Sequence, residues 1–268
     1  MKTLDDLIKA LWEDYANLNK QAGAIFKLLT ARGEKVFNDH IAFRTYDLPK
    51  IGLGKIAKHF ERFGYAAKGE YHFKVKKLYA RHYEHPQPGR PLVFISELKT
   101  AECSRELQDT VKGLVDQVPE KKVDAPGFPV AGRLWKPTTF AVYEKLKTES
   151  EYAAWLSVFG FRANHFTVQY NALKGFKDFQ AFNQFLIDSG FKMNTSGGLI
   201  KGTPKELLEQ SSTLAHPAEV KFADKKATVP ACYYEFARRY PDARGKLFMG
   251  FVEQSADKIF ESTDNKQR

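Results

Sequence analysis

The sequence predicts an α+β protein in which two βαβββ modules form one curved mixed sheet around a metal site. Three observations support this prediction. Two distant segments resemble each other, each runs from an alternating strand into an amphipathic helix, and each strand begins with a histidine. The modules are expected at about 36–100 and 160–255, within a single domain of 268 residues, and helical additions are expected at about 1–30 and 101–158.

The N-terminal stretch MKTLDDLIKALWEDY predicts an amphipathic helix, because Leu4, Ile8 and Leu11 recur at helical spacing. Acidic residues interrupt its apolar pattern, which argues against a secretory signal. The sequence contains no run of about 18 apolar residues, so we expect no membrane span. Two cysteines, Cys103 and Cys232, do not make a disulfide framework. We therefore expect the protein in the cytoplasm.

The composition is that of a globular protein with a basic surface. Apolar residues make up 43% of the chain, and 42 basic against 32 acidic residues give a formal charge of +10. This charge favours an anionic partner. The basic residues are scattered and no nucleic-acid-binding motif accompanies them, so an acidic metabolite is the expected partner and nucleic acid is not. Nothing in the sequence indicates the oligomeric state. Only the polar end, 262–268, has the composition of a tail.

An internal repeat is the most informative feature of the chain. One copy opens with DHIAFRT and the other with NHFTVQ, and each continues through a loop into a helix that stops at a glycine. The histidines, His40 and His165, are 125 residues apart, and the glycines, Gly64 and Gly190, are 126 residues apart. Two landmarks in nearly the same register indicate a duplicated module.

Each copy predicts a strand, a helix and then further strands. Period-two alternation marks the opening strands, and the glycines suit helix C-termini. Later strands are expected at 71–83 and 92–98 in the first copy, and at 219–223 and 231–238 in the second. The stretch SGGLIKGTPKELLEQSS is interpreted as a mobile rim with a short helix that begins at Thr203-Pro204.

Strand alternation brings together the side chains that could carry chemistry. His40 and Arg44 share one face of the first strand, as His165 and Gln169 do in the second, so two symmetric modules would turn both histidines into one cavity. The strand ACYYEFARRY adds Glu235, a carboxylate whose burial would be costly without a partner. Two imidazoles and one carboxylate form the facial triad of non-haem Fe(II) oxygenases, although zinc, nickel or manganese would fit these ligands equally well.

Three further side chains are candidates near this site. Glu97 lies in the matching late strand of the first module, where it would be either a fourth ligand or a strand-end residue facing solvent or a lysine. Arg44 lies roughly 13 Å from His40 along an extended strand, and would either grip a substrate carboxylate or form an internal salt bridge. Gln169 is its counterpart in the second copy and a second candidate for binding the substrate.

Together these motifs resemble the 2-oxoadipate dioxygenase/decarboxylase family. The resemblance covers about 35–255 and rests on DHIAFRT around His40, FISEL at 94–98, NHFTVQ around His165, GGLIKGTPKELLEQSS, and YEFARR around Glu235. It implies a vicinal-oxygen-chelate-like fold. It also implies a single Fe(II) held by His40, His165 and Glu235, with Arg44 as the substrate-binding arginine.

The resemblance implies oxidative decarboxylation of 2-oxoadipate with O2, which gives 2-hydroxyglutarate and CO2 in lysine catabolism. The partners would then be a small anionic 2-oxo acid and O2. One alternative is a metal-dependent isomerase or lyase that acts on a small oxo-acid without O2, and oxygen consumption separates it from the leading hypothesis. The other is a non-enzymatic basic binding module, for which absence of stoichiometric metal and salt-sensitive nucleic-acid binding would be diagnostic.

Overall fold

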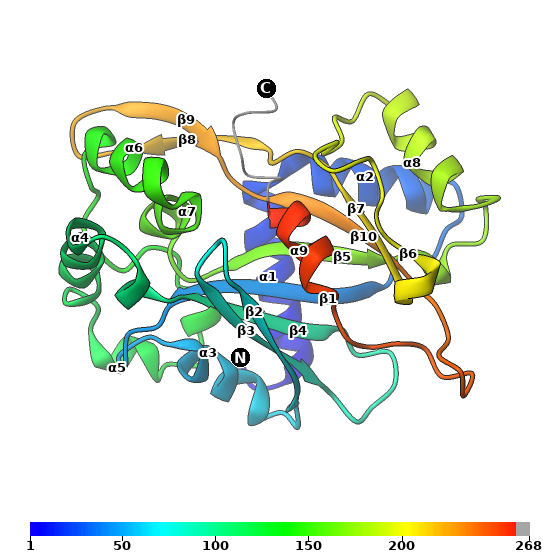
Figure 1. The fold of residues 1–268 in the computed structure, drawn as a ribbon, viewed down its shortest axis with the longest axis horizontal. Helices are drawn as coiled ribbons and strands as arrows, with labels where there is room; N and C mark the ends of the chain where they lie inside the picture. The colour runs from blue at the N-terminus through cyan, green and yellow to red at the C-terminus, as the bar shows by residue number, and fades with distance from the viewer. Residues whose placement is uncertain (261–268) are drawn as a thin grey trace.

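The computed structural model describes residues 1–260, without the side chains of 255–257 and 260, and contains one eight-stranded mixed sheet (Figure 1). At its centre β1 (Asn38–Tyr46) pairs antiparallel with β5 (Ala163–Gln169). On their outer edges β1 pairs in parallel with β4 (Leu92–Leu98), and β5 pairs in parallel with β10 (Tyr233–Arg239). The predicted tail, 262–268, lies outside the described residues.

Each half of the sheet is one βαβββ module, as predicted. The first consists of β1, α3 (Leu53–Glu61), β2 (Ala66–Phe73), β3 (Leu78–Glu84) and β4. The second consists of β5, α8 (Phe179–Asp188), β6 (Lys201–Thr203), β7 (Leu208–Ser212) and β10. Outward from the centre the order is β1-β4-β3-β2 on one side and β5-β10-β7-β6 on the other. An approximate two-fold axis therefore passes between β1 and β5.

The prediction was wrong about the middle of the second module. The segment interpreted as a mobile rim supplies β6 and β7 of the main sheet, although a short 3-10 helix does follow Thr203. The strand expected at 219–223 belongs to a separate two-stranded sheet, β8 (Pro217–Lys221) and β9 (Lys226–Pro230). The pattern misled because β7 buries polar side chains, including Gln210 and Ser212, that sequence alternation assigns to the surface.

Glycines end both module helices, as the sequence predicted. Gly64 follows α3 with φ of +97° and Gly190 follows α8 with φ of +87°, a backbone region that glycine enters without steric cost. After α8, the amide of Phe191 donates to the carbonyl oxygen of Leu186, which satisfies a carbonyl at the helix end. The chain can therefore turn back sharply into the next strand of each module.

Helices cover the outer face of the sheet, which carries its apolar side chains. Helix α1 (Leu4–Leu18), the predicted N-terminal helix, packs Trp12 and Tyr15 against Phe166 of β5, with ring centroids 5.2 and 5.0 Å away. Helix α2 (Lys20–Ala31) follows it, and α8 places Phe182 against Phe236 of β10. Burial of side chains this large stabilises the fold by about 1.5–3 kcal/mol each.

The opposite, inner face is partly covered by helices that are not part of the modules. The segment between the modules forms α4 (Arg105–Val115), α5 (Glu120–Val123), α6 (Phe140–Glu149) and α7 (Glu151–Phe159), in agreement with the predicted helical addition. Of these helices, α7 lies against Arg44 on the inner face, whereas α5 contacts His59 of α3. Helix α9 (Glu253–Phe260) contacts β2, β6 and β7 (Figure 1). Among the described residues, no helix is both long and apolar enough to cross a membrane.

Candidate metal centre

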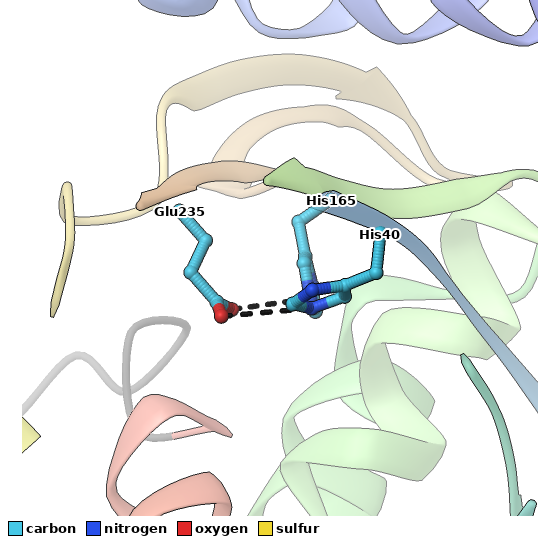
Figure 2. Close-up of side chains that lie close together, drawn as sticks. All are labelled: His40, His165 and Glu235. Atoms are coloured by element: carbon cyan, nitrogen blue, oxygen red, sulfur yellow. Dashed lines mark ion pairs between the residues drawn. The ribbon is translucent and has the colours of Figure 1, made fainter. Parts of the chain in front are cut away.

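Three side chains from neighbouring strands converge on the inner face: His40 of β1, His165 of β5 and Glu235 of β10 (Figure 2). Their ligand atoms all lie within 4.8 Å of one another. Nε2 of His165 is 3.2 Å from Oε2 of Glu235, and Nε2 of His40 is 3.5 Å from Oε1. All three side chains are at most 4% exposed. The structure thus brings together the residues that the sequence analysis selected, and we call them the metal centre.

The chemistry of the metal centre suits an ion. Nitrogen and oxygen ligands lie about 2.0–2.2 Å from a bound divalent metal ion, so two ligand atoms of one ion lie about 3 Å apart. The distances from Glu235 to His165 and His40, 3.2 and 3.5 Å, are close to this value. Burial lowers the pKa of His165 well below its ordinary value, the charge of Arg44 acts in the same direction, and both favour the neutral imidazole that binds metals. Burial also raises the pKa of Glu235. A cation would offset the cost of this buried carboxylate.

The residue before each histidine fixes its imidazole. Nδ1 of His40 donates to Asp39 at 2.8 Å, and Nδ1 of His165 donates to Asn164 at 3.0 Å. A bond from Nδ1 leaves Nε2 of each ring unprotonated and directed at the centre. The sequence carried this signal, because both copies of the repeat place a polar residue before the histidine. In the structure this polar residue accepts the hydrogen bond from Nδ1 of the histidine that follows it.

Asp39 is held in turn by a buried arginine from β10. Nε and Nη2 of Arg239 donate to the two carboxylate oxygens of Asp39 at 2.7 and 2.9 Å. Burial alone would raise the pKa of Asp39, but the charge of Arg239 and the bond from His40 hold it well below its usual range. Asp39 therefore stays charged, and its bond from Nδ1 fixes the orientation of the His40 imidazole. No pattern in the sequence indicated this role of Arg239.

Two further polar side chains contact the metal centre. Nε2 of Gln210, on β7, donates to Oε1 of Glu235 at 2.6 Å and fixes the rotation of the carboxylate. The hydroxyl of Thr167 lies 3.0 Å from Nε2 of His40, to which it can donate. Sequence reasoning missed Gln210 because it lies in the segment interpreted as a rim. No local signal marks it as a neighbour of Glu235, 25 residues further along the chain.

Arg44 lies on the inner face as expected and is buried against α7. Its guanidinium carbon is 5.0 Å from the ring centroid of Tyr152 and 5.1 Å from that of Trp155, within the range of cation–π attraction. It shares the inner face of β1 with His40, and its charge contributes to the lowered pKa of His165. Its role in binding substrate stays a prediction.

Glu97, the possible fourth ligand, does not lie at the metal centre. Glu97 pairs with Thr45 of β1 and therefore lies on the outer face, where its Oε2 accepts from the amide of Leu53 at the start of α3. The position that corresponds to Glu235 by symmetry belongs to Phe94, which pairs with Ala42. The first module thus supplies an aromatic ring in place of a second carboxylate.

Gln169, the second candidate for binding substrate, is the last residue of β5. Its side chain is half-buried, and its backbone pairs with Ala237 of β10. This position lies four residues beyond His165 in the strand, as Arg44 lies four residues beyond His40. A contact between Gln169 and the substrate stays a prediction.

We expect Asp39→Asn to weaken Fe(II) binding by about 10- to 100-fold, the usual effect of losing a carboxylate behind a histidine ligand. Asparagine can still accept the bond from His40, but it lacks the charge that strengthens the imidazole. The measurement is Fe(II) affinity by competition with a chromophoric chelator, with the melting temperature recorded in parallel. Asp5→Asn, at an exposed position, is the control. Unchanged affinity in a folded Asp39→Asn variant would contradict the role given to Asp39.

Comparison with known proteins identifies one family. The family model described as 2-oxoadipate dioxygenase/decarboxylase matches residues 2–123 and 130–248. A curated relative from Oryza sativa subsp. japonica is named 2-oxoadipate dioxygenase/decarboxylase, chloroplastic/amyloplastic. It is 34% identical over 278 aligned residues, which cover 94% of this chain and 76% of the relative.

Solved structures share the fold. A hydroxyglutarate synthase from Oryza sativa, in complex with 2-oxoadipate, superimposes with a TM-score of 0.93 at 33% identity, covering 98% of this chain and 92% of that one. A protein of Shewanella frigidimarina NCIMB 400, provisionally named a hydrolase, gives 0.90 at 47% identity, covering 94% and 99%. A protein of Ralstonia eutropha JMP134, provisionally placed in the glyoxalase superfamily, gives 0.74 at 21% identity, covering 90% and 83%. The predicted fold class is confirmed.

Proposed function

Because the chain belongs to the 2-oxoadipate dioxygenase/decarboxylase family, we propose that it converts 2-oxoadipate and O2 into 2-hydroxyglutarate and CO2. The observation that carries the proposal is the buried metal centre of His40, His165 and Glu235. It lies in a fold shared with a hydroxyglutarate synthase whose structure contains 2-oxoadipate. We further propose that the reaction serves lysine catabolism.

We propose Fe(II) as the ion of the metal centre. The centre offers two imidazole nitrogens and one carboxylate, the ligand set found in non-haem iron oxygenases. If Fe(II) were held by these three residues, it would supply the electrons that activate O2 beside a bound 2-oxo acid. Among the described residues, no other group of three histidine, cysteine or acidic side chains could hold an ion.

The surrounding side chains of the chain prepare this site before the substrate arrives. Asp39 and Asn164 orient the imidazoles, and Gln210 holds the carboxylate of Glu235, so little reorganisation is needed when the ion binds. The ring of Phe251 packs edge-on against His40, with centroids 4.9 Å apart, and limits the access of water from that side.

Arg44 gives the site its preference for an acid. Its guanidinium presents parallel N–H donors that match the two oxygens of a carboxylate, and the aromatic rings of α7 keep it in place. A 2-oxo dicarboxylic acid has one carboxylate next to its keto group and another at its far end. Arg44 would hold the far carboxylate, so that the keto end is positioned at the metal centre.

The deciding test is oxygen uptake by anaerobically purified, Fe(II)-loaded protein after addition of 2-oxoadipate. We expect one CO2 released for each O2 consumed, because both atoms of O2 end in the products, and we expect His40→Ala to abolish uptake. The change in this variant removes one metal ligand and leaves Arg44 intact. If the wild-type protein binds one iron per chain but consumes no O2 with this acid, the proposed reaction is wrong. Conversion of an oxo-acid without O2 would then favour an isomerase or lyase.

A further inference from the structure

A tyrosine beside the metal centre has no part in the ligand arrangement described above. Tyr233 begins β10 and pairs in register with His165, so it lies on the inner face two residues before Glu235. Its ring stacks on the imidazole of His165, with centroids 4.5 Å apart and planes 25° apart. The side chain is completely buried. Tyr233 is therefore a fixed wall of the site.

The hydroxyl group of Tyr233 has a proton to donate. Tyrosine is neutral at physiological pH, because its ordinary pKa is about 10. Within the part of the chain that the structure describes, the hydroxyl of Tyr233 finds no acceptor. The guanidinium of Arg44 can donate to this hydroxyl but cannot accept from it, and a buried donor without an acceptor costs about 1–3 kcal/mol. An acceptor brought by a ligand would recover this energy.

Arg44 lies close to the same hydroxyl. Burial raises the pKa of Tyr233, as does the negative charge of Glu235, whereas the guanidinium of Arg44 acts against both. Arg44 also acts electrostatically on His165, the residue on which Tyr233 stacks. A cation and a neutral O–H donor thus lie together on one side of the metal centre. A carboxylate, which is an anion with two acceptor oxygens, can accept hydrogen bonds from both donors.

We propose that Tyr233 is a specificity-determining residue, which donates its hydroxyl proton to the distal carboxylate of a 2-oxo dicarboxylic acid held by Arg44. This inference rests on the proposed function. Arg44 supplies charge and a planar pair of donors, and Tyr233 supplies a third hydrogen bond of fixed direction. Without a distal carboxylate the buried hydroxyl of Tyr233 is left without an acceptor, so the site discriminates against 2-oxo monocarboxylic acids.

The test is Tyr233→Phe, which removes the hydroxyl and keeps the ring that stacks on His165. Binding of 2-oxoadipate to Fe(II)-loaded protein is measured by calorimetry without O2, and KM and kcat are measured by oxygen uptake. The comparison acid is 2-oxohexanoate, which lacks only the distal carboxylate. We expect Kd and KM for 2-oxoadipate to rise by about 10-fold or more, as for a hydrogen bond to a charged group. Binding of 2-oxohexanoate and of Fe(II) is expected to stay the same.

Tyr234→Phe is the matched control. Tyr234 is the next residue, is equally buried and also has a hydroxyl without a partner among the described residues, but it lies on the outer face against Trp12. We expect this variant to bind both acids as the wild type does. If instead both variants weaken binding equally, the loss reflects general packing and the inference is overturned.

Other outcomes separate this inference from the proposed function. If the wild type consumes O2 and Tyr233→Phe binds 2-oxoadipate equally well, the inference fails while the proposed function stands. If Tyr233→Phe loses equal affinity for the two acids, or binds Fe(II) more weakly, Tyr233 acts only through His165. Either result would also overturn the inference. If the wild type binds 2-oxoadipate but consumes no O2, the proposed reaction fails. Comparing Kd for 2-oxoadipate between the wild type and Tyr233→Phe then still tests the role of Tyr233.

Discussion

Replacing Glu235 by glutamine is expected to abolish metal-dependent turnover and to weaken Fe(II) binding by about a thousandfold or more, beyond the 10- to 100-fold typical of residues behind the ligands. Glutamine has nearly the same shape and can still accept the bond from Gln210, but it offers no negative charge. The measurements are iron per chain after dialysis, affinity by chelator competition, and oxygen uptake with 2-oxoadipate.

The stability of the metal-free Glu235→Gln variant gives an independent test of this explanation. Glu235 is 1% exposed, and its carboxylate is costly to bury without a cation. We therefore expect the metal-free variant to melt at the same temperature as the metal-free wild type or higher, and to gain no stability from Fe(II). Glu209→Gln, on the neighbouring strand β7, is the control and should keep iron. A variant that retains stoichiometric iron would rule out Glu235 as a ligand.

The second large effect is expected for Arg44→Lys. Lysine keeps the positive charge but loses the planar pair of donors and the stacking of a guanidinium on Tyr152 and Trp155. We expect KM for 2-oxoadipate to rise by about 100-fold, because each hydrogen bond between charged groups contributes about 1.5–3 kcal/mol. Fe(II) affinity should stay the same, because the three ligands are intact.

Oxygen uptake over a range of 2-oxoadipate concentrations separates this effect from damage to the metal centre. Arg81→Lys is the control, because Arg81 is partly exposed and pairs with Glu70 at the far side of the sheet. If Arg44→Lys lowers iron binding together with the affinity for the acid, Arg44 supports the centre and does not hold the substrate. An unchanged KM for 2-oxoadipate would show that Arg44 does not bind the substrate.

The repeat in the sequence was sufficient to predict the paired modules and the inner face on which the histidines lie. Period-two alternation determines which side chains share a face of a strand, and this property is local to the strand. The glycines at 64 and 190 likewise encode their own positive φ. For this reason His40, His165 and Glu235 could be selected as ligands before any contact between the strands was known.

Contacts between strands determined which other side chains lie at the metal centre. Glu97 and Glu235 look alike in the sequence, but pairing with β1 puts Glu97 on the outer face and Phe94 at the symmetric position. A shift of one residue in the pairing of a strand moves each of its side chains to the opposite face of the sheet. The hydrogen bonds to the neighbouring strand set this pairing. Gln210 and Arg239 reach the metal centre for the same reason, from strands β7 and β10.

The sequence by itself therefore determined which three residues are the candidate ligands, because alternation along each single strand decides which face a side chain lies on. Only the tertiary structure decided which polar groups hold those ligands and which carboxylate is excluded. Which groups hold the ligands, and which carboxylate lies elsewhere, depends on the pairing of strands that are far apart in the chain. It also depends on which polar side chains are buried. Burial requires each such side chain to find a partner, and the partner cannot be read from its neighbours in sequence.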